Sequence, residues 1–222
     1  MCGRFVSRTD AAMERAFNLI PRQWRPDWQS FNIAPSQPVP VVLQRNGQRE
    51  GWMARWGLIP PWCHGEPPKF STFNARAENL GKAASFRGPW QRRQRCLIPA
   101  LGFYEWQQQP GAGKQPYLIR RLGGEIFAFG GLWETSSHPD GTQVLSCTII
   151  TLPANELVGR IHAKNRMPLM LTPEQAEDWL ERREADAETM LQSYPAADME
   201  AWPVSTRVNR VGADDEALIA PI

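Results

Sequence analysis

Residues 95–107 read RCLIPALGFYEWQ, a run of mainly apolar and aromatic side chains that predicts a β-strand. Three more stretches of β-branched and aromatic residues follow it along the chain: 116–122, 125–134 and 144–152. Upstream, residues 39–44 and 49–57 flank Asn46-Gly47, a dipeptide typical of a tight hairpin turn. Strands joined by short connections pair antiparallel. The chain therefore predicts mostly antiparallel β-sheets of barrel-like or sandwich-like form.

Helices are expected at the periphery of these sheets. They are predicted over four stretches: 10–19 (capped by Thr9), 77–92, 153–161 and an acidic C-terminal segment at about 172–195 that packs on the sheets. Thr172 followed by Pro173 is typical of a helix start. The proline-rich stretches 20–38 and 58–74 predict ordered loops. The expected fold is a single α+β domain over residues 1–222.

The charge of the chain is uneven. The net charge of +2 combines a basic body, with 21 Lys and Arg against 11 Asp and Glu through residue 170, and a C-terminal part with 4 against 12. Twenty-one of the 25 basic residues are Arg, whose planar side chain suits phosphate and bases. A basic body can bind a polyanion, whereas a solvated acidic helix face would explain the C-terminal part equally well.

Composition also bounds location and cofactors. No run of about eighteen apolar residues suggests a membrane span, and the N-terminal sequence lacks the apolar stretch of a signal peptide. We therefore expect a cytoplasmic protein. The four cysteines, Cys2, Cys63, Cys96 and Cys147, form no CxxC pair, and the histidines do not complete a zinc-ligand spacing. Free thiols, no metal and no cofactor are expected.

The second residue carries the most unusual chemistry. Initiator methionine is generally removed before a residue as small as cysteine, which would leave Cys2 with an α-amine and a thiol two carbons apart. Their reference pKa values, about 8 and about 8.5, leave both partly unprotonated near neutral pH. An aldehyde can form an imine with the amine, and the thiol can then close a thiazolidine ring. A chance cysteine at a frayed terminus is the alternative, but Gly3, Arg4 and Phe5 supply a hinge, a phosphate ligand and an anchor.

Three further stretches contain residues that could move protons or hold charge. Glu105 lies between aromatic neighbours near the end of an apolar strand, where desolvation would raise its pKa; a solvent-facing strand edge is the alternative. Asn74, Arg76 and Glu78 alternate and would share one face of an extended backbone, or else form a polar turn before a helix. His162, flanked by three basic residues, is either a catalytic base or a loop histidine.

Ten tryptophans are many for this length, and most should lie in the core. Four stand beside Pro, Arg or Gly in irregular stretches, where stacking on an unpaired base is an alternative to burial: Trp24, Trp28, Trp62 and Trp106.

Six motifs, in this order along the chain, resemble the SOS-response-associated peptidase (SRAP) family, which includes abasic-site processing proteins. They are CGRF at 2–5, FNIAP at 31–35, RWGLIPPW at 55–62, FNARAE at 73–78, RCLIPALGFYEW at 95–106, and IH followed by RMP at 161–168. The resemblance runs from residue 2 to about residue 209.

The resemblance implies an abasic-site sensor that binds single-stranded DNA and forms a covalent thiazolidine crosslink through Cys2, which shields the lesion. By the match, Asn74 positions the Cys2 terminus or the opened sugar, Glu105 shuttles protons, and His162 assists near the phosphate or a sugar hydroxyl. A cytoplasmic monomer that joins the nucleoid when bound to DNA is expected. The expected DNA contacts are Arg4, Arg76, Trp62, Pro40, Trp106 and Arg166.

The family name also implies an autoproteolytic peptidase activity that removes the initiator residue, and an imine would permit DNA-(abasic site) lyase chemistry. Two alternatives remain open: a non-covalent module that reads single strands or modified bases, and a cysteine peptidase acting on proteins with His162 as base. One departure concerns His162. Family members usually place one residue before Arg-Met-Pro, whereas Ala163-Lys164-Asn165 intervene here, so His162 could sit differently and Arg166 could cover part of its work.

Overall fold

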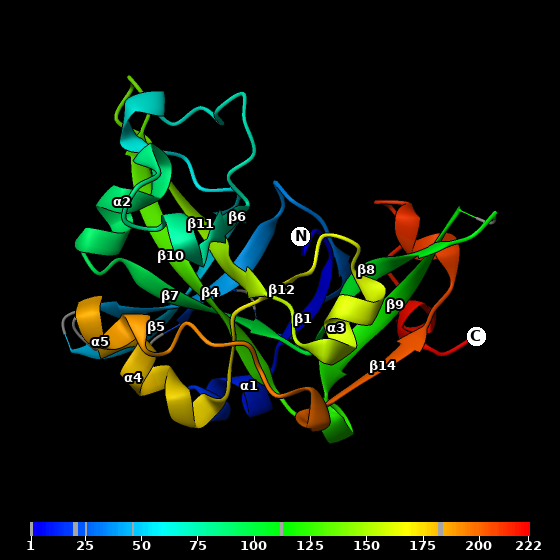
Figure 1. Ribbon diagram of the computed structural model, residues 1–222. Helices are drawn as coiled ribbons and strands as arrows, with labels where there is room; N and C mark the ends of the chain where they lie inside the picture. Colours follow the sequence, from blue (N-terminus) through cyan, green and yellow to red (C-terminus); the bar gives the residue numbers. More distant parts are fainter. Residues whose placement is uncertain (1, 20–21, 25, 46, 112, 182–183) are drawn as a thin grey trace.

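The computed structural model describes residues 2–19, 22–24, 26–45, 47–111, 113–181 and 184–222, and its strands form two sheets (Figure 1). In the first sheet, the neighbouring strands are all antiparallel. Their order is β14 (Met199–Pro203), β9 (Gly113–Arg121), β8 (Gly102–Gln109), β1 (Phe5–Thr9) and β3 (Trp28–Ile33).

The second sheet closes on itself. Its order is β12 (Arg166–Pro168), β11 (Gln143–Pro153), β10 (Phe127–Ser137), β7 (Arg95–Ala100), β4 (Pro38–Arg45), β5 (Gln48–Trp56) and β2 (Arg22–Gln23), with β13 (Met170–Leu171) on β10 and β6 (Asn74–Arg76) on β11. β5 also pairs in parallel with β11, through Arg55 opposite Ser146 and Trp56 opposite Cys147. β4, β5, β11, β10 and β7 therefore form a closed barrel. The expected α+β class with largely antiparallel, barrel-like sheets is confirmed.

Residues 95–107 connect the two sheets. The sequence predicted one strand there, but the chain turns at Leu101, so that β7 belongs to the barrel and β8 to the other sheet. The Leu101 amide donates to the Val6 carbonyl over 2.9 Å. A Cβ atom at Gly102 would lie 3.1 Å from the Ile119 carbonyl oxygen, so a larger residue there would require β9 to move by a few tenths of an ångström. The stretch with the strongest strand signal is thus also the link between the sheets.

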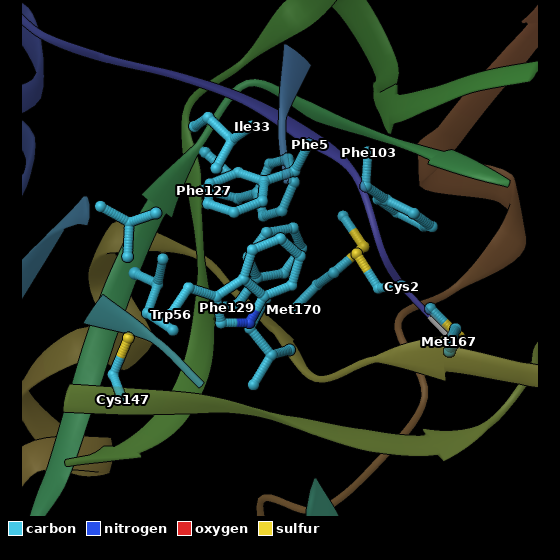
Figure 2. Close-up of a cluster of buried hydrophobic side chains, with 14 of the residues drawn as sticks. Cys2, Phe5, Ile33, Trp56, Phe103, Phe127, Phe129, Cys147, Met167 and Met170 are labelled. Atoms are coloured by element: carbon cyan, nitrogen blue, oxygen red, sulfur yellow. The ribbon is translucent and has the colours of Figure 1, made fainter. Parts of the chain in front are cut away.

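Aromatic side chains from both sheets form the core between them (Figure 2). Phe5 of β1 meets Trp56 and Phe129 of the barrel edge-on, with ring centroids 5.0 and 5.4 Å apart. All three are fully buried. Such contacts contribute about 0.5–1.5 kcal/mol each beyond the area they bury. They fix the first strand of the chain, and with it the N-terminal residues, against the barrel.

The helices are short and lie around the outside of the strands (Figure 1). The α-helices are α1 (Ala11–Ala16), α2 (Ala84–Gln91), α3 (Glu156–Ile161), α4 (Ala176–Glu181) and α5 (Glu184–Glu188). The 3-10 turns are η1 (Pro61–Cys63), η2 (Ala77–Asn79), η3 (Leu122–Gly124), η4 (Pro173–Gln175), η5 (Ala196–Asp198), η6 (Thr206–Asn209) and η7 (Glu216–Ile219). α4 packs on β7, where the indole of buried Trp179 donates to the Cys96 carbonyl over 3.0 Å. None of the helices within the described ranges has the length and apolar character needed to cross a membrane.

Several local expectations needed correction. Asp10, not Thr9, caps α1, because the Asp10 side chain accepts from the Met13 amide while Thr9 ends β1. The stretch 20–38, expected as loop, contains β3, whose pairing with β1 supplies its partners. The predicted helix 77–92 divides into η2 and α2. Asn46 and residues 182–183 lie outside the described residues, although the two strands that Asn46 was expected to join do pair antiparallel.

Candidate active site

Cys2 lies at the start of β1, where the chain enters the core between the sheets (Figure 2). β1 pairs with β8 through Phe5 and Phe103. The Tyr104 amide also donates to the Arg4 carbonyl over 2.9 Å. The Cys2 side chain is fully buried, and burial raises the pKa of its thiol well above the ordinary range. The sulfur is therefore protonated at neutral pH.

β6 places Asn74 against the same end of the chain. Its parallel pairing with β11 sets Asn74 opposite Ile149. Asn74 Nδ2 donates to the Cys2 carbonyl oxygen over 2.8 Å. Asn74 Oδ1 is buried and accepts no hydrogen bond from the described residues. The amide thus holds the Cys2 backbone and keeps an acceptor for a further donor, since a buried polar atom left unpaired costs about 1–3 kcal/mol.

Glu105 lies in β8, opposite Tyr117 of β9, with only 2% of its surface exposed. Burial raises the pKa of its carboxyl group from 4.5 to about 7. The desolvation that its aromatic neighbours predicted is present, and the solvent-facing alternative is wrong. At neutral pH both protonation states are populated, so the group can both give and take a proton.

His162 follows α3 and faces Glu105. Its Nε2 lies 3.7 Å from Glu105 Oε2, and its Nδ1 lies 2.8 Å from the Arg166 carbonyl oxygen. The first distance exceeds a hydrogen bond, so a proton passes only if the pair closes or a substrate atom lies between them. Burial lowers the pKa of the imidazole below its usual 6.5. Near pH 7 the site thus combines a neutral imidazole with a carboxyl group close to its midpoint.

The longer connection after His162 forms a tight turn. The Asn165 amide donates to the His162 carbonyl over 2.8 Å, and Asn165 has a left-handed backbone with φ of 51°. Asparagine tolerates this conformation better than most residues. The turn absorbs the additional residues, so His162 still reaches Glu105, and it leaves Lys164 exposed.

A pocket of about 460 Å³ opens beside Glu105 and His162. Aromatic and aliphatic groups form part of its lining, and two lysines contribute positive charge. The remaining lining residues are Phe73, Trp106, Gln108, Lys114, Ala163 and Lys164. A proton-transfer pair beside two ammonium groups suits an anionic substrate with a reactive group that gains or loses protons.

Two of the expected DNA contacts are exposed. Arg76 lies at the end of β6, next to the strand positions that hold Asn74. Trp62 is 52% exposed in η1, within a segment that projects from the barrel (Figure 1). Phe70 belongs to the same projecting segment and is 57% exposed. Its neighbourhood of prolines and Lys69 was the available signal, but the sequence analysis did not single it out.

Arg4 and Trp106 have partners within the protein. Arg4 donates to Asn32 Oδ1 over 2.7 Å and to the Val208 carbonyl over 2.6 Å. The Trp106 indole donates to Asn209 Oδ1 over 2.7 Å while its ring lines the pocket. Both side chains therefore tie the C-terminal segment to the site.

Pro40 and Arg166 are placed differently from the expectation. Pro40 was expected to contact DNA, but it is buried in β4 opposite Met53, so its ring is not at the surface. Arg166 is 9% exposed, and its guanidinium contacts Glu78 and Thr151.

Neither Lys114 nor the pairing of Glu78 with Arg166 was predicted from the sequence. Lys114 follows Glu105 by nine residues but lies on the next strand, and the register of β9 on β8, in which Lys114 faces Gln108, brings it to the pocket. Glu78 was noted for its alternation with Asn74 and Arg76, but no spacing rule indicated a partner 88 positions away.

This fold and site define a class of proteins in which a cysteine at position 2 is buried between a closed barrel and a second antiparallel sheet. A family profile described as SOS response associated peptidase (SRAP) matches residues 1–211. The chain belongs to this family.

Two relatives and one solved structure are similar to the chain over most of its length. The chain is 41% identical over 217 residues to an abasic site processing protein, YoqW, of Bacillus subtilis (strain 168), with 94% of each chain covered. It is 34% identical to the abasic site processing protein HMCES of Gallus gallus, covering all of this chain and 78% of that one. A crystal structure of a protein from Bordetella bronchiseptica matches with a TM-score of 0.81 and 26% identity, over 92% of this chain and 100% of that one.

Proposed function

We propose that the mature chain is an abasic-site sensor that traps abasic sites in single-stranded DNA as a covalent thiazolidine crosslink on Cys2. The observation that carries the proposal is the convergence of Cys2, Asn74, Glu105 and His162, from four separate segments, at one end of β1. The names of the relatives support abasic DNA as the substrate. An abasic deoxyribose opens to an aldehyde, the electrophile that an aminothiol needs.

The proposed reaction begins when hydrolysis of the Met1–Cys2 peptide bond frees the α-amine of Cys2. The amine adds to the aldehyde carbon of the opened sugar to give a carbinolamine, which loses water and forms an imine. The thiol then adds across the C=N bond: sulfur bonds to carbon, and the thiol proton ends on nitrogen. The product is a thiazolidine ring, and the net reaction releases one water.

Glu105 and His162 divide the proton transfers. Protonated Glu105 gives its proton to the hydroxyl group that leaves as water, and the carboxylate formed can accept the proton of the thiol. His162 is neutral and accepts a proton from the sugar hydroxyl during ring opening. The Cys2 thiol cannot ionise on its own because burial raises its pKa, so ring closure needs a neighbouring base, and the ionised Glu105 is that base. Asn74 holds the Cys2 backbone, and its Oδ1 is available to the liberated amine.

The basic surface around the site would hold the DNA backbone. Lys114 and Lys164 line the pocket beside Glu105, and Arg76 is exposed near Asn74. Charge-assisted contacts of this kind position a nucleic acid without reading its sequence. Trp62, exposed on the projecting segment, would stack on an unpaired base.

We also propose that the same site removes Met1, the autoproteolytic peptidase activity that the family name describes, and that the imine permits slow lyase cleavage of the abasic strand by β-elimination. A monomer in the cytoplasm that joins the nucleoid with its DNA substrate is the expected state.

Intact-mass spectrometry tests the function. The purified protein should lack Met1 and gain the mass of one strand less one water when mixed with a single-stranded oligonucleotide that contains one abasic site. Cys2→Ser, which keeps the amine but replaces sulfur, should lose the heat-stable adduct, while an imine trapped by borohydride should persist. The control Cys63→Ser should crosslink like wild type. A full yield of heat-stable adduct with Cys2→Ser would refute the proposed ring.

A further inference from the structure

The side chain of Glu78 reaches His162 through Arg166. The Arg166 carbonyl oxygen, which can only accept, lies 2.8 Å from His162 Nδ1. Nδ1 must therefore carry the hydrogen, and in the neutral ring Nε2 keeps its lone pair. Nε2 is the atom that faces Glu105, at 3.7 Å. The position of the Arg166 carbonyl thus decides whether Nε2, which faces Glu105, accepts or donates a hydrogen bond.

The backbone that carries this carbonyl lies in a short strand. β12 has three residues, Arg166–Pro168, and pairs with β11 at Thr151–Pro153. Pro168 and Pro153 lack an amide hydrogen, so this short ladder contains fewer hydrogen bonds than its length allows. The turn before β12 adopts a left-handed conformation at Asn165. The Ala154 amide donates to the Asn165 carbonyl over 3.0 Å and the Leu169 amide donates to the Ile150 carbonyl over 2.8 Å, which holds the backbone on both sides of β12, and side-chain contacts add to this.

The Arg166 side chain supplies these contacts. Its two terminal nitrogens bond both carboxylate oxygens of Glu78, at 2.5 and 3.0 Å. One of them also donates to the Thr151 carbonyl at 2.5 Å and lies 3.2 Å from Thr151 Oγ1. The third nitrogen, Nε, is buried and has no hydrogen-bond partner among the described residues. No edge of this guanidinium faces solvent in an arrangement that would take a phosphate.

Glu78 itself is accessible and does not touch the reacting groups. Its side chain is 53% exposed, against 11% for Arg166. It belongs to η2, which directly follows the β6 strand that carries Asn74. The two hydrogen bonds between Glu78 and Arg166 therefore join the segment after Asn74 to the segment after His162. A bidentate ion pair of this kind is stronger and more directional than a single hydrogen bond.

We propose that Glu78 is a positioning residue, which holds Arg166 so that its carbonyl keeps His162 in the Nδ1–H tautomer with Nε2 as an acceptor toward Glu105. Arg166 then serves the reaction through its contacts with Glu78, Thr151 and His162. The kinetic consequence rests on the proposed function, but the tautomer can be measured without DNA.

Nitrogen-15 NMR of histidine-labelled protein at pH 8 tests the assignment. The chain has three histidines, and His162→Gln identifies the signal of His162. Wild type should show His162 with the proton on Nδ1. Glu78→Gln should move His162 toward a mixture of tautomers, and Glu78→Asp, which keeps the charge, should restore part of the wild-type signal. Glu66→Gln is the matched control, because Glu66 lies 3.7 Å from His138 and should leave His162 unchanged.

Crosslinking rates provide the second readout. Glu78→Gln should slow adduct formation by roughly 10- to 100-fold, the range typical of outer partners that orient a functional histidine. Its affinity for a tetrahydrofuran-containing strand, an abasic analogue that cannot react, should stay within twofold of wild type. An unchanged His162 tautomer in a folded Glu78→Gln protein overturns the proposal, whether or not wild type crosslinks. A large loss of strand affinity with an unchanged tautomer would instead make the pair a DNA contact.

Discussion

Replacing Glu105 with Gln should stabilise the folded protein in a manner that depends on pH. The pKa of Glu105 is about 7 in the folded protein and 4.5 ordinarily, so the unfolded chain loses this proton first as pH rises. The stability contributed by protonated Glu105 is complete below about pH 4.5 and is lost as pH rises through about 7. A difference of about 2.5 pKa units, at about 1.4 kcal/mol each, gives a loss of about 3.5 kcal/mol once both forms are fully ionised.

Urea denaturation followed by tryptophan fluorescence measures this effect. We expect the free energy of unfolding of Glu105→Gln, relative to wild type, to grow by about 2–3 kcal/mol from pH 5 to pH 8. In thermal melts this corresponds to a gain of about 5–10 °C in Tm. Comparing the two pH values removes the constant effect of packing an amide in place of a carboxyl group. The same variant should lose crosslinking, because an amide transfers no proton.

The exposed residue Glu181 on α4 provides a control. Glu181→Gln should change stability by a similar small amount at both pH values. If the curves of wild type and Glu105→Gln ran parallel from pH 5 to pH 8, the carboxylate would not be destabilised by burial, and its proposed role as a proton donor near pH 7 would lose its basis.

Two further predictions concern the cysteines and the lysines. In the native protein, iodoacetamide should modify the partly exposed Cys63 well before the buried Cys2, and peptide mapping at pH 8 would contradict the burial argument if both reacted at one rate. Lys114→Ala and Lys164→Ala should each make the slope of log affinity against log salt shallower by about 0.7 for an abasic-analogue single strand. Lys82 lines a separate pocket beside Trp90, so Lys82→Ala should leave the slope unchanged. If the Lys114→Ala and Lys164→Ala slopes equalled that of Lys82→Ala, Lys114 and Lys164 would not contact the DNA.

The fold class could be read from the sequence because strand signals are local. The apolar run at 39–43 and the hairpin signal of Asn46-Gly47 predict β4 and β5 without knowledge of their neighbours. β3 escaped detection since its stability comes from pairing with β1, and no composition rule reports a partner in advance. The division of residues 95–107 follows from different partners, since β7 pairs with β4 and β10 whereas β8 pairs with β1 and β9.

The candidate site was partly predictable for a related reason. Cys2 and Glu105 could be proposed from their own chemistry and neighbours, and the raised pKa of Glu105 agrees with its aromatic surroundings. Lys114 reaches the pocket only through strand register. Arg166 shows the converse: its charge suggested a phosphate contact, whereas the fold surrounds it with Glu78 and Thr151. Charge in a sequence indicates which interactions a residue can make, and the fold decides which partner it meets.

The burial of Cys2 also bears on the order of bond formation. The sulfur lies among apolar side chains such as Phe129 and Met170 (Figure 2), while the Cys2 carbonyl is held by Asn74 at the polar end of the site. A protonated, enclosed thiol is a poor first nucleophile. Attack by the amine needs no ionised sulfur. The imine that results places its electrophilic carbon close enough to the Cys2 sulfur for a five-membered ring to close. Effective concentration then compensates for the weak nucleophile. On these grounds the amine reacts first and the sulfur second, so a variant without sulfur should accumulate imine, whereas acetylation of the amine should leave the thiol unable to capture the lesion.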